Sequence, residues 1–117
     1  IWGTWCGPCR DEMRYAHELK KRYAGKDIVF VYLDKDDTVR EKIWKEYVHV
    51  AGLEGEHYRM NNTEIEVIWK SIREAGNENI RSYPTYVIID RQGAIVHPSA
   101  ERPGSREKLY AQLDKLL

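Results

Sequence analysis

Both cysteines of this 117-residue chain lie in one four-residue stretch, Cys6-Gly7-Pro8-Cys9, close to its first residue. A disulfide between them would close a very small loop. Because stabilisation by loop closure grows with loop length, such a bridge would add little to the stability of a fold. A structural staple is therefore the weaker interpretation. The spacing favours a chemical role for the two thiols, either as metal ligands or as a redox pair.

Zinc binding and haem attachment are the two alternatives to a redox pair. A CxxC pair can supply half of a zinc site, but the histidines that would complete it show no close metal-ligand spacing. These histidines are His17, His49, His57 and His97. Covalent haem attachment needs CxxCH, and position 10 is Arg. A redox dithiol is favoured, and we expect neither a metal nor an organic cofactor.

The residues that follow Pro8 predict a helix that begins at the dithiol. Proline suits the first helical position, and apolar residues recur at helical spacing as far as Gly25, which is expected to end the helix. A helix over residues 8–24 places Cys6 at its N-terminus and Cys9 one turn inside, facing the core. That end of a helix lowers the pKa of a thiol, and a change from ~8.5 to ~7 corresponds to about 2 kcal/mol. We therefore expect Cys6 to be the nucleophile and Cys9 the resolving thiol.

Three further segments carry strand signals. Residues 28–34 (IVFVYLD) form a continuous apolar and β-branched run, as in a strand buried on both faces. Residues 53–62 are polar and ambiguous, although they fit a short strand. Residues 82–98 predict two antiparallel strands that are joined by a turn at residues 90–93. There is no internal repeat and no linker.

Capping boxes predict the starts of two further helices, and Ser105 is expected to cap a last one. The boxes pair Thr38 with Glu41 and Thr63 with Glu66, and Gly52 and Gly76 are expected to end these helices. The expected inward-facing residues are Val39, Ile43, Tyr47 and Val50, then Ile65, Ile68, Trp69 and Ile72, and finally Leu109, Leu113 and Leu116. Trp44 and Trp69 are both expected in the core.

Composition limits the partners. With 19 basic and 19 acidic residues the formal net charge is zero, so the chain has no electrostatic footprint for nucleic acid. No stretch approaches the roughly 18 consecutive apolar residues that a membrane span needs. Its 42% hydrophobic and 32% charged residues are close to globular averages. We expect a single domain over residues 1–117.

The stretch WCGPC (residues 5–9), together with Tyr83-Pro84-Thr85 before an apolar strand, resembles the thioredoxin superfamily. The resemblance covers nearly the whole chain. It implies an α/β, thioredoxin-like fold with a central mixed β-sheet flanked by helices, and a cis-Pro84 that faces the CxxC across the active site. It also implies a set of substrate-binding positions, with Trp5 as a hydrophobic shelf. They are Trp5, Gly7, Pro8, Tyr83, Pro84 and Thr85.

More narrowly, the chain resembles the TlpA/ResA-like envelope thiol–disulfide oxidoreductases. The phrase PTYVIIDRQG (residues 84–93) is similar to their hairpin, and the extra length between the CxxC and this hairpin matches a segment that the group carries, expected here around residues 53–81. Many members also hold an acidic residue where this chain has Glu12. Glu12 shares a helix side with Cys9 and could accept its proton. The alternative is a solvated first-turn Glu that the helix dipole favours, and both interpretations stay open.

The resemblance also accounts for the early position of the cysteines. Thioredoxin folds have a strand that leads directly into the CxxC, and only residues 1–4 precede it here. A buried acid that assists the dithiol in plain thioredoxin would fall before Ile1. We therefore expect this chain to be a fragment of a longer protein, with N-terminal strands largely missing and a membrane anchor in the missing region as an option.

The function implied is thiol–disulfide exchange, with Cys6 and Cys9 as catalytic residues and Glu12 assisting. The Gly-Pro dipeptide is that of thioredoxin, a reductant at about −270 mV, rather than that of oxidising members at about −120 mV, so reduction of protein disulfides is favoured. The partners implied are disulfide-containing proteins and a membrane or envelope electron donor, in the periplasm or cell envelope. A cytoplasmic location is the alternative. The alternative functions are an oxidase or isomerase, a peroxidase, and a non-catalytic binding module of a larger envelope protein.

Overall fold

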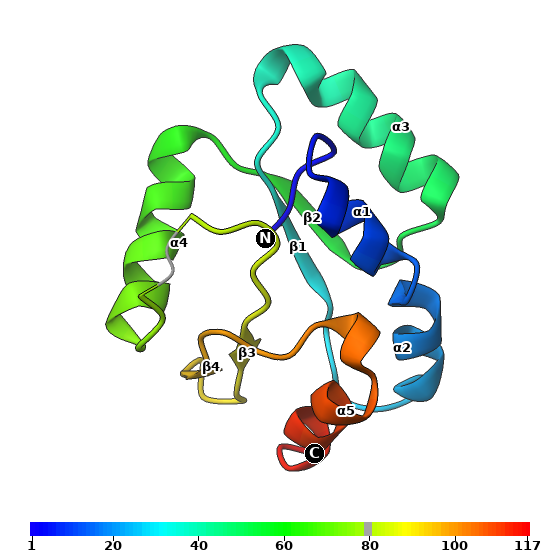
Figure 1. Ribbon diagram of the computed structural model, residues 1–117, viewed down its shortest axis with the longest axis vertical. Coiled ribbons are helices and arrows are strands. Elements are labelled where there is room, and N and C mark those ends of the chain that lie inside the picture. The colour runs from blue at the N-terminus through cyan, green and yellow to red at the C-terminus, as the bar shows by residue number, and fades with distance from the viewer. Residues whose placement is uncertain (79–80) are drawn as a thin grey trace.

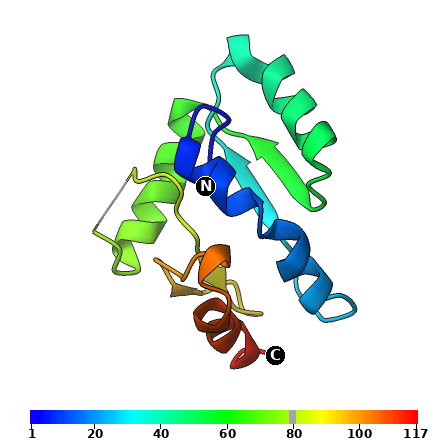
Figure 2. The same ribbon diagram turned by 45° about the vertical axis from the view of Figure 1, so that its right-hand side comes forward.

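The computed structural model describes residues 1–78 and 81–117 and contains two small β-sheets surrounded by helices (Figure 1). β1 (Val31–Asp34) pairs in parallel with β2 (Glu56–Arg59), and β3 (Ile88–Ile89) pairs antiparallel with β4 (Ile95–His97). The α-helices are α1 (Gly7–Met13), α2 (Ala16–Arg22), α3 (Glu41–Ala51), α4 (Asn62–Glu74) and α5 (Glu107–Asp114), and the 3-10 helices are η1 (Thr38–Arg40) and η2 (Pro103–Ser105). Figures 1 and 2 place α3 and α5 at opposite ends of the molecule.

The first two residues connect β1 with the segment that leads into β3 through backbone hydrogen bonds. The Trp2 N–H donates to the Leu33 carbonyl at 3.0 Å, and the Trp2 carbonyl accepts from the Lys35 N–H at 2.8 Å. On the other side, the Ile1 carbonyl accepts from the Thr85 N–H at 3.2 Å. The expected single mixed sheet is therefore present only in part. Parallel and antiparallel pairs both occur, but the connecting segments are too short to form one continuous ladder.

β1 is shorter and less buried than its apolar run predicts. Residues 28–30 lie outside the strand, and Val31 is exposed, whereas Asp34 is fully buried. Tyr32, on the same face as Asp34, packs against the core cluster of α1 and α3. The prediction of burial on both faces was wrong. A continuous apolar run shows that residues can be buried, but it does not supply the elements that would cover them.

The helix expected over residues 8–24 is two helices, α1 and α2. Between them, the Arg14 and Tyr15 N–H groups bond to carbonyls three residues back, so the backbone tightens into a 3-10 turn and the helix is interrupted. The apolar stripe is nevertheless buried as predicted. It consists of Cys9, Met13, Ala16, Leu19 and Tyr23. Periodicity reports which face is buried, and it is insensitive to a local break in the hydrogen-bond ladder.

The predicted side-chain caps differ from those observed. Thr38 opens η1 and makes no capping bond, and the Ser105 hydroxyl donates to the Arg102 carbonyl instead of capping α5. α4 does begin with a capping box, but its residues are Asn61 and Glu64. Polar residues able to cap follow one another in this stretch, so the choice among them depends on where the helix starts and cannot be read from the spacing alone.

The buried faces of the later helices agree only partly with the predictions. α4 buries Ile65, Trp69 and Ile72 as expected, and α3 buries Trp44 as expected. The prediction was wrong for Val39, Ile43 and Val50, which are exposed, whereas Tyr47 is half-buried and packs against Trp2 in the core. Gly52 ends α3 in the left-handed region, with φ of 60°. In α5 Leu109 is buried, Leu113 is half-buried and Leu116 is exposed.

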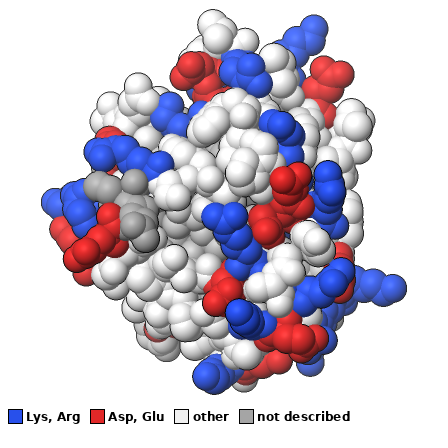
Figure 3. Space-filling view, in the orientation of Figure 1, with Lys and Arg blue, Asp and Glu red and all other residues white. Residues whose placement is uncertain are grey.

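No helix in residues 1–78 and 81–117 is both long enough and apolar enough to cross a membrane. Figure 3 shows basic and acidic side chains interspersed over the visible face outside the grey residues, without a large area of one sign. This distribution agrees with the zero net charge.

Replacing Asn61 with Ala is expected to lower the free energy of unfolding by about 1 kcal/mol, because the first turn of α4 loses its side-chain acceptor. The Asn61 Oδ1 accepts from the Glu64 N–H at 2.8 Å. Urea denaturation of the oxidised chain measures the change. Thr63→Ala is the matched control, since Thr63 is exposed in the same turn and takes no part in the box. Equal losses in the two variants would contradict this assignment.

Candidate active site

The two cysteines are joined by a disulfide at the start of α1. Cys6 is the residue that precedes the helix, and its Sγ accepts a hydrogen bond from the Cys9 N–H at 3.2 Å. Between them, Gly7 is half-buried and Pro8 is exposed in the first turn, where proline was predicted. Cys6 retains 5% of its surface and Cys9 none, so Cys6 is the sulfur nearer to solvent.

The inner side of the disulfide belongs to the apolar core. The buried residues of this cluster are Trp2, Cys6, Cys9, Met13, Ala16, Trp44 and Leu53. The Cys6 N–H donates to the Gly3 carbonyl at 3.1 Å, which closes a tight turn immediately before α1. The two cysteines thus lie between the apolar core cluster and a short hydrogen-bonded loop.

Trp5 forms an exposed apolar surface beside Cys6. Its indole Nε1 donates to the Lys35 carbonyl at 3.1 Å, and 47% of the residue is exposed. The ring lies over Gly3 so closely that a Cβ there would come within 2.3 Å of the indole Nε1. Any side chain at position 3 would displace the ring. The orientation of Trp5 is therefore fixed from two sides.

The segment around Pro84 reaches the same region. The Tyr83–Pro84 peptide bond is cis, as the resemblance implies, and Pro84 and Thr85 are buried. The Tyr83 ring packs edge-to-face on Trp5, with centroids 4.9 Å apart, and on Trp69 of α4, with centroids 5.6 Å apart. The structure thus brings two of the predicted substrate-binding side chains, Trp5 and Tyr83, into direct contact.

Glu12 has a role that neither interpretation of the sequence includes. Its Oε2 accepts a hydrogen bond from the Gly104 N–H at 2.8 Å, so the half-buried carboxylate ties α1 to η2. Gly104 lies near the other end of the chain, which explains why local spacing could not reveal this partner. The role of Glu12 in proton transfer remains a prediction.

Two buried carboxyl groups near the site were missed from the sequence. Asp34 ends β1 and is fully buried, and Asp36 is 1% exposed in the loop that follows. The Asp36 carboxylate accepts hydrogen bonds from the Thr4 N–H at 3.1 Å and from the Thr4 hydroxyl at 2.9 Å. The available signal was an Asp-x-Asp directly after an apolar strand, because functional side chains in α/β folds gather at the carboxyl ends of strands.

The two carboxyl groups differ in charge. Burial, and then the neighbouring Asp36 carboxylate, raises the pKa of Asp34 to about 8, so Asp34 carries a proton at neutral pH. Burial alone would raise the pKa of Asp36, but hydrogen bonds from Asp34, Thr4 and Arg40 outweigh it, and the pKa lies below its usual value. The two carboxyl groups together therefore carry one negative charge, on Asp36. The Arg40 Nε lies 3.2 Å from the Asp36 Oδ1.

Comparison with known proteins identifies the family. The Redoxin family model matches residues 1–113. The chain belongs to the Redoxin family. The thiol-disulfide oxidoreductase ResA of Bacillus thuringiensis (strain Al Hakam) is 30% identical to it over 116 residues, which cover 99% of this chain and 60% of that protein. The thioredoxin-like protein YneN of Bacillus subtilis (strain 168) is 32% identical over 95 residues, which cover 81% of this chain and 50% of that protein.

A solved structure supports the same assignment. A crystal structure from Bacteroides vulgatus, described as that of a candidate thiol-disulfide oxidoreductase, superposes on this redoxin with a TM-score of 0.72 at 33% identity. The match covers 99% of this chain and 74% of that chain. The chain spans about 60% of the length of the ResA proteins that it matches. The predicted thioredoxin-like α/β fold and the similarity to the ResA group are confirmed.

The buried Asp34 predicts a pH-dependent stability. Between pH 3.8, its ordinary pKa, and about 8 the folded chain keeps this proton while the unfolded chain releases it. The folded state then binds more protons, so this group makes stability fall as the pH rises through that window, with no further loss above it. Asp34→Asn cannot ionise, and its stability relative to the unsubstituted chain is expected to increase from pH 5 to pH 8.

Urea denaturation of the oxidised proteins at the two pH values measures this difference. Asp11→Asn is the control, because Asp11 is exposed and pairs only with the exposed Arg14 at 3.6 Å among the described residues. Its difference from the unsubstituted chain should stay constant between pH 5 and pH 8. A constant difference for Asp34→Asn as well would contradict the assignment of the buried proton.

Proposed function

We propose that this chain is the catalytic domain of a thiol–disulfide oxidoreductase that reduces protein disulfides through Cys6 and Cys9. The observation that carries the proposal is the disulfide at the start of α1, with the Cys9 N–H directed at the Cys6 sulfur. In the reduced protein the same N–H would stabilise a Cys6 thiolate, because a hydrogen bond to the charged form favours it. The names of the ResA relatives support the same activity.

In the reducing direction, the Cys6 thiolate attacks one sulfur of a disulfide in the partner protein. A Cys6–partner disulfide forms, and the other partner sulfur leaves as a thiolate and takes up a proton. The Cys9 thiol then loses its proton, and its thiolate attacks Cys6 Sγ. The Cys6–Cys9 bond forms and the second partner sulfur is released. The partner disulfide gains the two electrons that the dithiol loses.

Glu12 is the proposed acceptor for the Cys9 proton. It lies three residues after Cys9 in α1, and its carboxylate is half-buried rather than fully solvated. The Gly104 N–H engages Oε2 and holds the group near η2, and the described residues show no hydrogen bond to Oε1. That oxygen can take a proton without first breaking a protein contact.

The proposed binding surface is built around Trp5 and Tyr83, with Pro84 and Thr85 behind them and Gly7 and Pro8 in the first turn of α1. An extended segment of the partner would lie beside this backbone with strand-like hydrogen bonds. We also propose that the chain is one domain and that residues 53–81 are an added recognition segment. Residues 79–80 of this segment lie outside the described residues.

The direction, partners and location are proposed from the resemblance to the TlpA/ResA-like group. Gly7-Pro8 matches the dipeptide of thioredoxin, which supports a reductase. A membrane or envelope electron donor would keep the pair reduced in the cell envelope. The alternatives are an oxidase or isomerase with the same dithiol, and a binding module without catalysis.

Single-cysteine variants test the assigned roles. Cys9→Ser is expected to accumulate mixed disulfides with a partner that carries an exposed disulfide, because no thiol remains to resolve them. Cys6→Ser should accumulate at least tenfold less, since Cys9 is fully buried. Non-reducing gel electrophoresis after acid quenching measures the adducts. Equal trapping by both variants would contradict the roles, and no trapping by either would favour the binding module.

The midpoint potential of the Cys6–Cys9 couple tests the direction. We expect a value below about −230 mV, in the range of the reducing members. Equilibration in glutathione buffers, with Trp fluorescence as the probe, measures it. A value above about −180 mV would overturn the reductase and favour an oxidase or isomerase.

A further inference from the structure

Thr4, two residues before Cys6, is buried, and each of its polar atoms is hydrogen-bonded. Its N–H and hydroxyl both donate to the Asp36 carboxylate, at 3.1 and 2.9 Å. The same hydroxyl accepts from the Arg40 Nη2 at 3.0 Å, and the Thr4 carbonyl accepts from the Arg10 Nη1. One residue of the active-site loop is thereby fixed by the loop that follows β1, by η1 and by α1.

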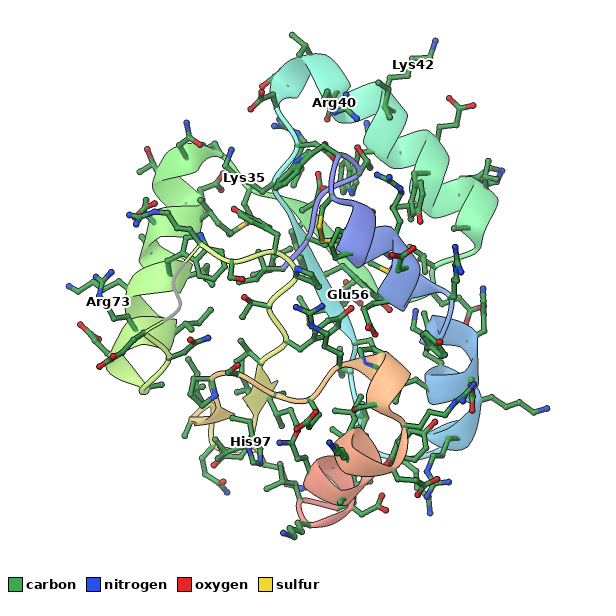
Figure 4. All side chains as sticks on the ribbon, viewed as in Figure 1. Lys35, Arg40, Lys42, Glu56, Arg73 and His97 are labelled. Atoms are coloured by element: carbon green, nitrogen blue, oxygen red, sulfur yellow. A yellow bond between two sulfur atoms is a disulfide. The ribbon has the colours of Figure 1, made fainter. Side chains whose placement is uncertain are left out.

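Asp36 is the centre of this network. Its side chain is fully buried, and its Oδ1 also accepts from the Arg40 Nε at 3.2 Å. Figure 4 shows Arg40 at the start of α3, beside the loop that leads into α1. A buried carboxylate without partners is costly, so the free energy that Asp36 gains from Thr4 and Arg40 strongly favours this one arrangement of the loop.

The network lies between two other fixed points of the same loop. Two residues before Thr4, the Trp2 backbone is paired with β1, and immediately after Thr4 the Trp5 indole donates to the Lys35 carbonyl. The loop then closes with the Cys6 N–H on the Gly3 carbonyl. The position of the Cys6 sulfur relative to the Cys9 N–H therefore depends on how Thr4 is held.

We propose that Asp36, supported by Arg40, is a positioning residue for the redox pair: it fixes Thr4 and thereby holds the Cys6 sulfur at the Cys9 N–H. This inference rests on the proposed thiol–disulfide exchange. In the oxidised state the covalent bond holds the Cys6 sulfur whether or not the network is intact. In the dithiol state only the loop and the Cys9 N–H hold it. The network therefore matters more to the reduced protein than to the oxidised one.

The expected consequence of breaking the network is a more reducing dithiol with a less acidic Cys6. Thr4→Val keeps the shape of the side chain and removes the hydroxyl that bonds Asp36 and Arg40, whereas Thr4→Ser keeps this hydroxyl. For Thr4→Val we expect about a tenfold shift of the exchange equilibrium with glutathione toward the disulfide, which corresponds to about 30 mV. The pKa of the Cys6 thiol should rise in the same variant, and Thr4→Ser should restore both values.

The measurements are the equilibrium with glutathione and the thiolate absorbance of Cys6 as a function of pH, in the full chain. Tyr23→Phe is a matched control, because it also removes a hydroxyl that donates to a carboxylate. That carboxylate is Asp114, near the C-terminus, at 2.8 Å. It should lower stability without moving either value. If Thr4→Val does not fold, Arg40→Gln is measured in the same way and should shift both values in the same direction.

The outcomes separate this inference from the proposed function. In one outcome the unsubstituted chain exchanges with glutathione, but Thr4→Val (or Arg40→Gln in its place) changes neither the equilibrium nor the pKa of Cys6 relative to Tyr23→Phe. The network then only stabilises the fold, and the positioning role is wrong. If the unsubstituted chain itself forms no mixed disulfide with glutathione, the proposed thiol–disulfide exchange is wrong, whatever the variants show. If Thr4→Ser, which keeps the hydroxyl, shifts both values as far as Thr4→Val does, the effect does not depend on the hydrogen bonds of that hydroxyl, and the inference is overturned.

Discussion

Backbone pairing of residues 1 and 2 with segments on either side of them is the constraint on which the site depends. Trp2 bonds to β1 on one side, and Ile1 bonds to Thr85 on the other. These bonds bring the loop before Cys6 and the segment after Pro84 to the same place, although the two are far apart in the chain. Each sheet has only two strands within the described residues, so these bonds add to the side-chain packing that holds β1 beside the dithiol.

A buried charge so close to the dithiol needs a physical reason. Burying the Asp36 carboxylate is unfavourable, and ion pairs of this kind often do no more than break even against apolar packing. Here the carboxylate and Arg40 bond the same Thr4 hydroxyl from two sides. Apolar residues could fill this space, but they would not specify one position for a loop of small and polar residues. The neutral Asp34 beside it avoids a second buried charge.

The sequence predicted the parts of the site that depend on local chemistry. Cys6 and Cys9 could be recognised because a two-residue spacing and a following proline are meaningful wherever they occur, and the stripe of α4 could be recognised because burial repeats with the helix period. Asp36 could not, since its role depends on Thr4, which is distant in the chain. The same reason hid the contact between Glu12 and Gly104. Which face of β1 is covered also depends on the elements that pack there, so its apolar run wrongly predicted burial on both faces.

The contact between α4 and the site shows how a distant segment can shape the dithiol surface. β2 pairs in parallel with β1, and the chain then enters α4, whose buried face packs against Ile1 of the N-terminal segment (Figure 1). Trp69 is almost fully buried, Tyr83 half-buried and Trp5 half-exposed, so the three rings form a column from the core to the surface. Each edge-to-face contact contributes about 0.5–1.5 kcal/mol beyond burial. A partner bound at the proposed surface would therefore rest on a Trp5 ring that α4 supports through Tyr83, so we expect substitutions in this helix to alter binding without touching the partner.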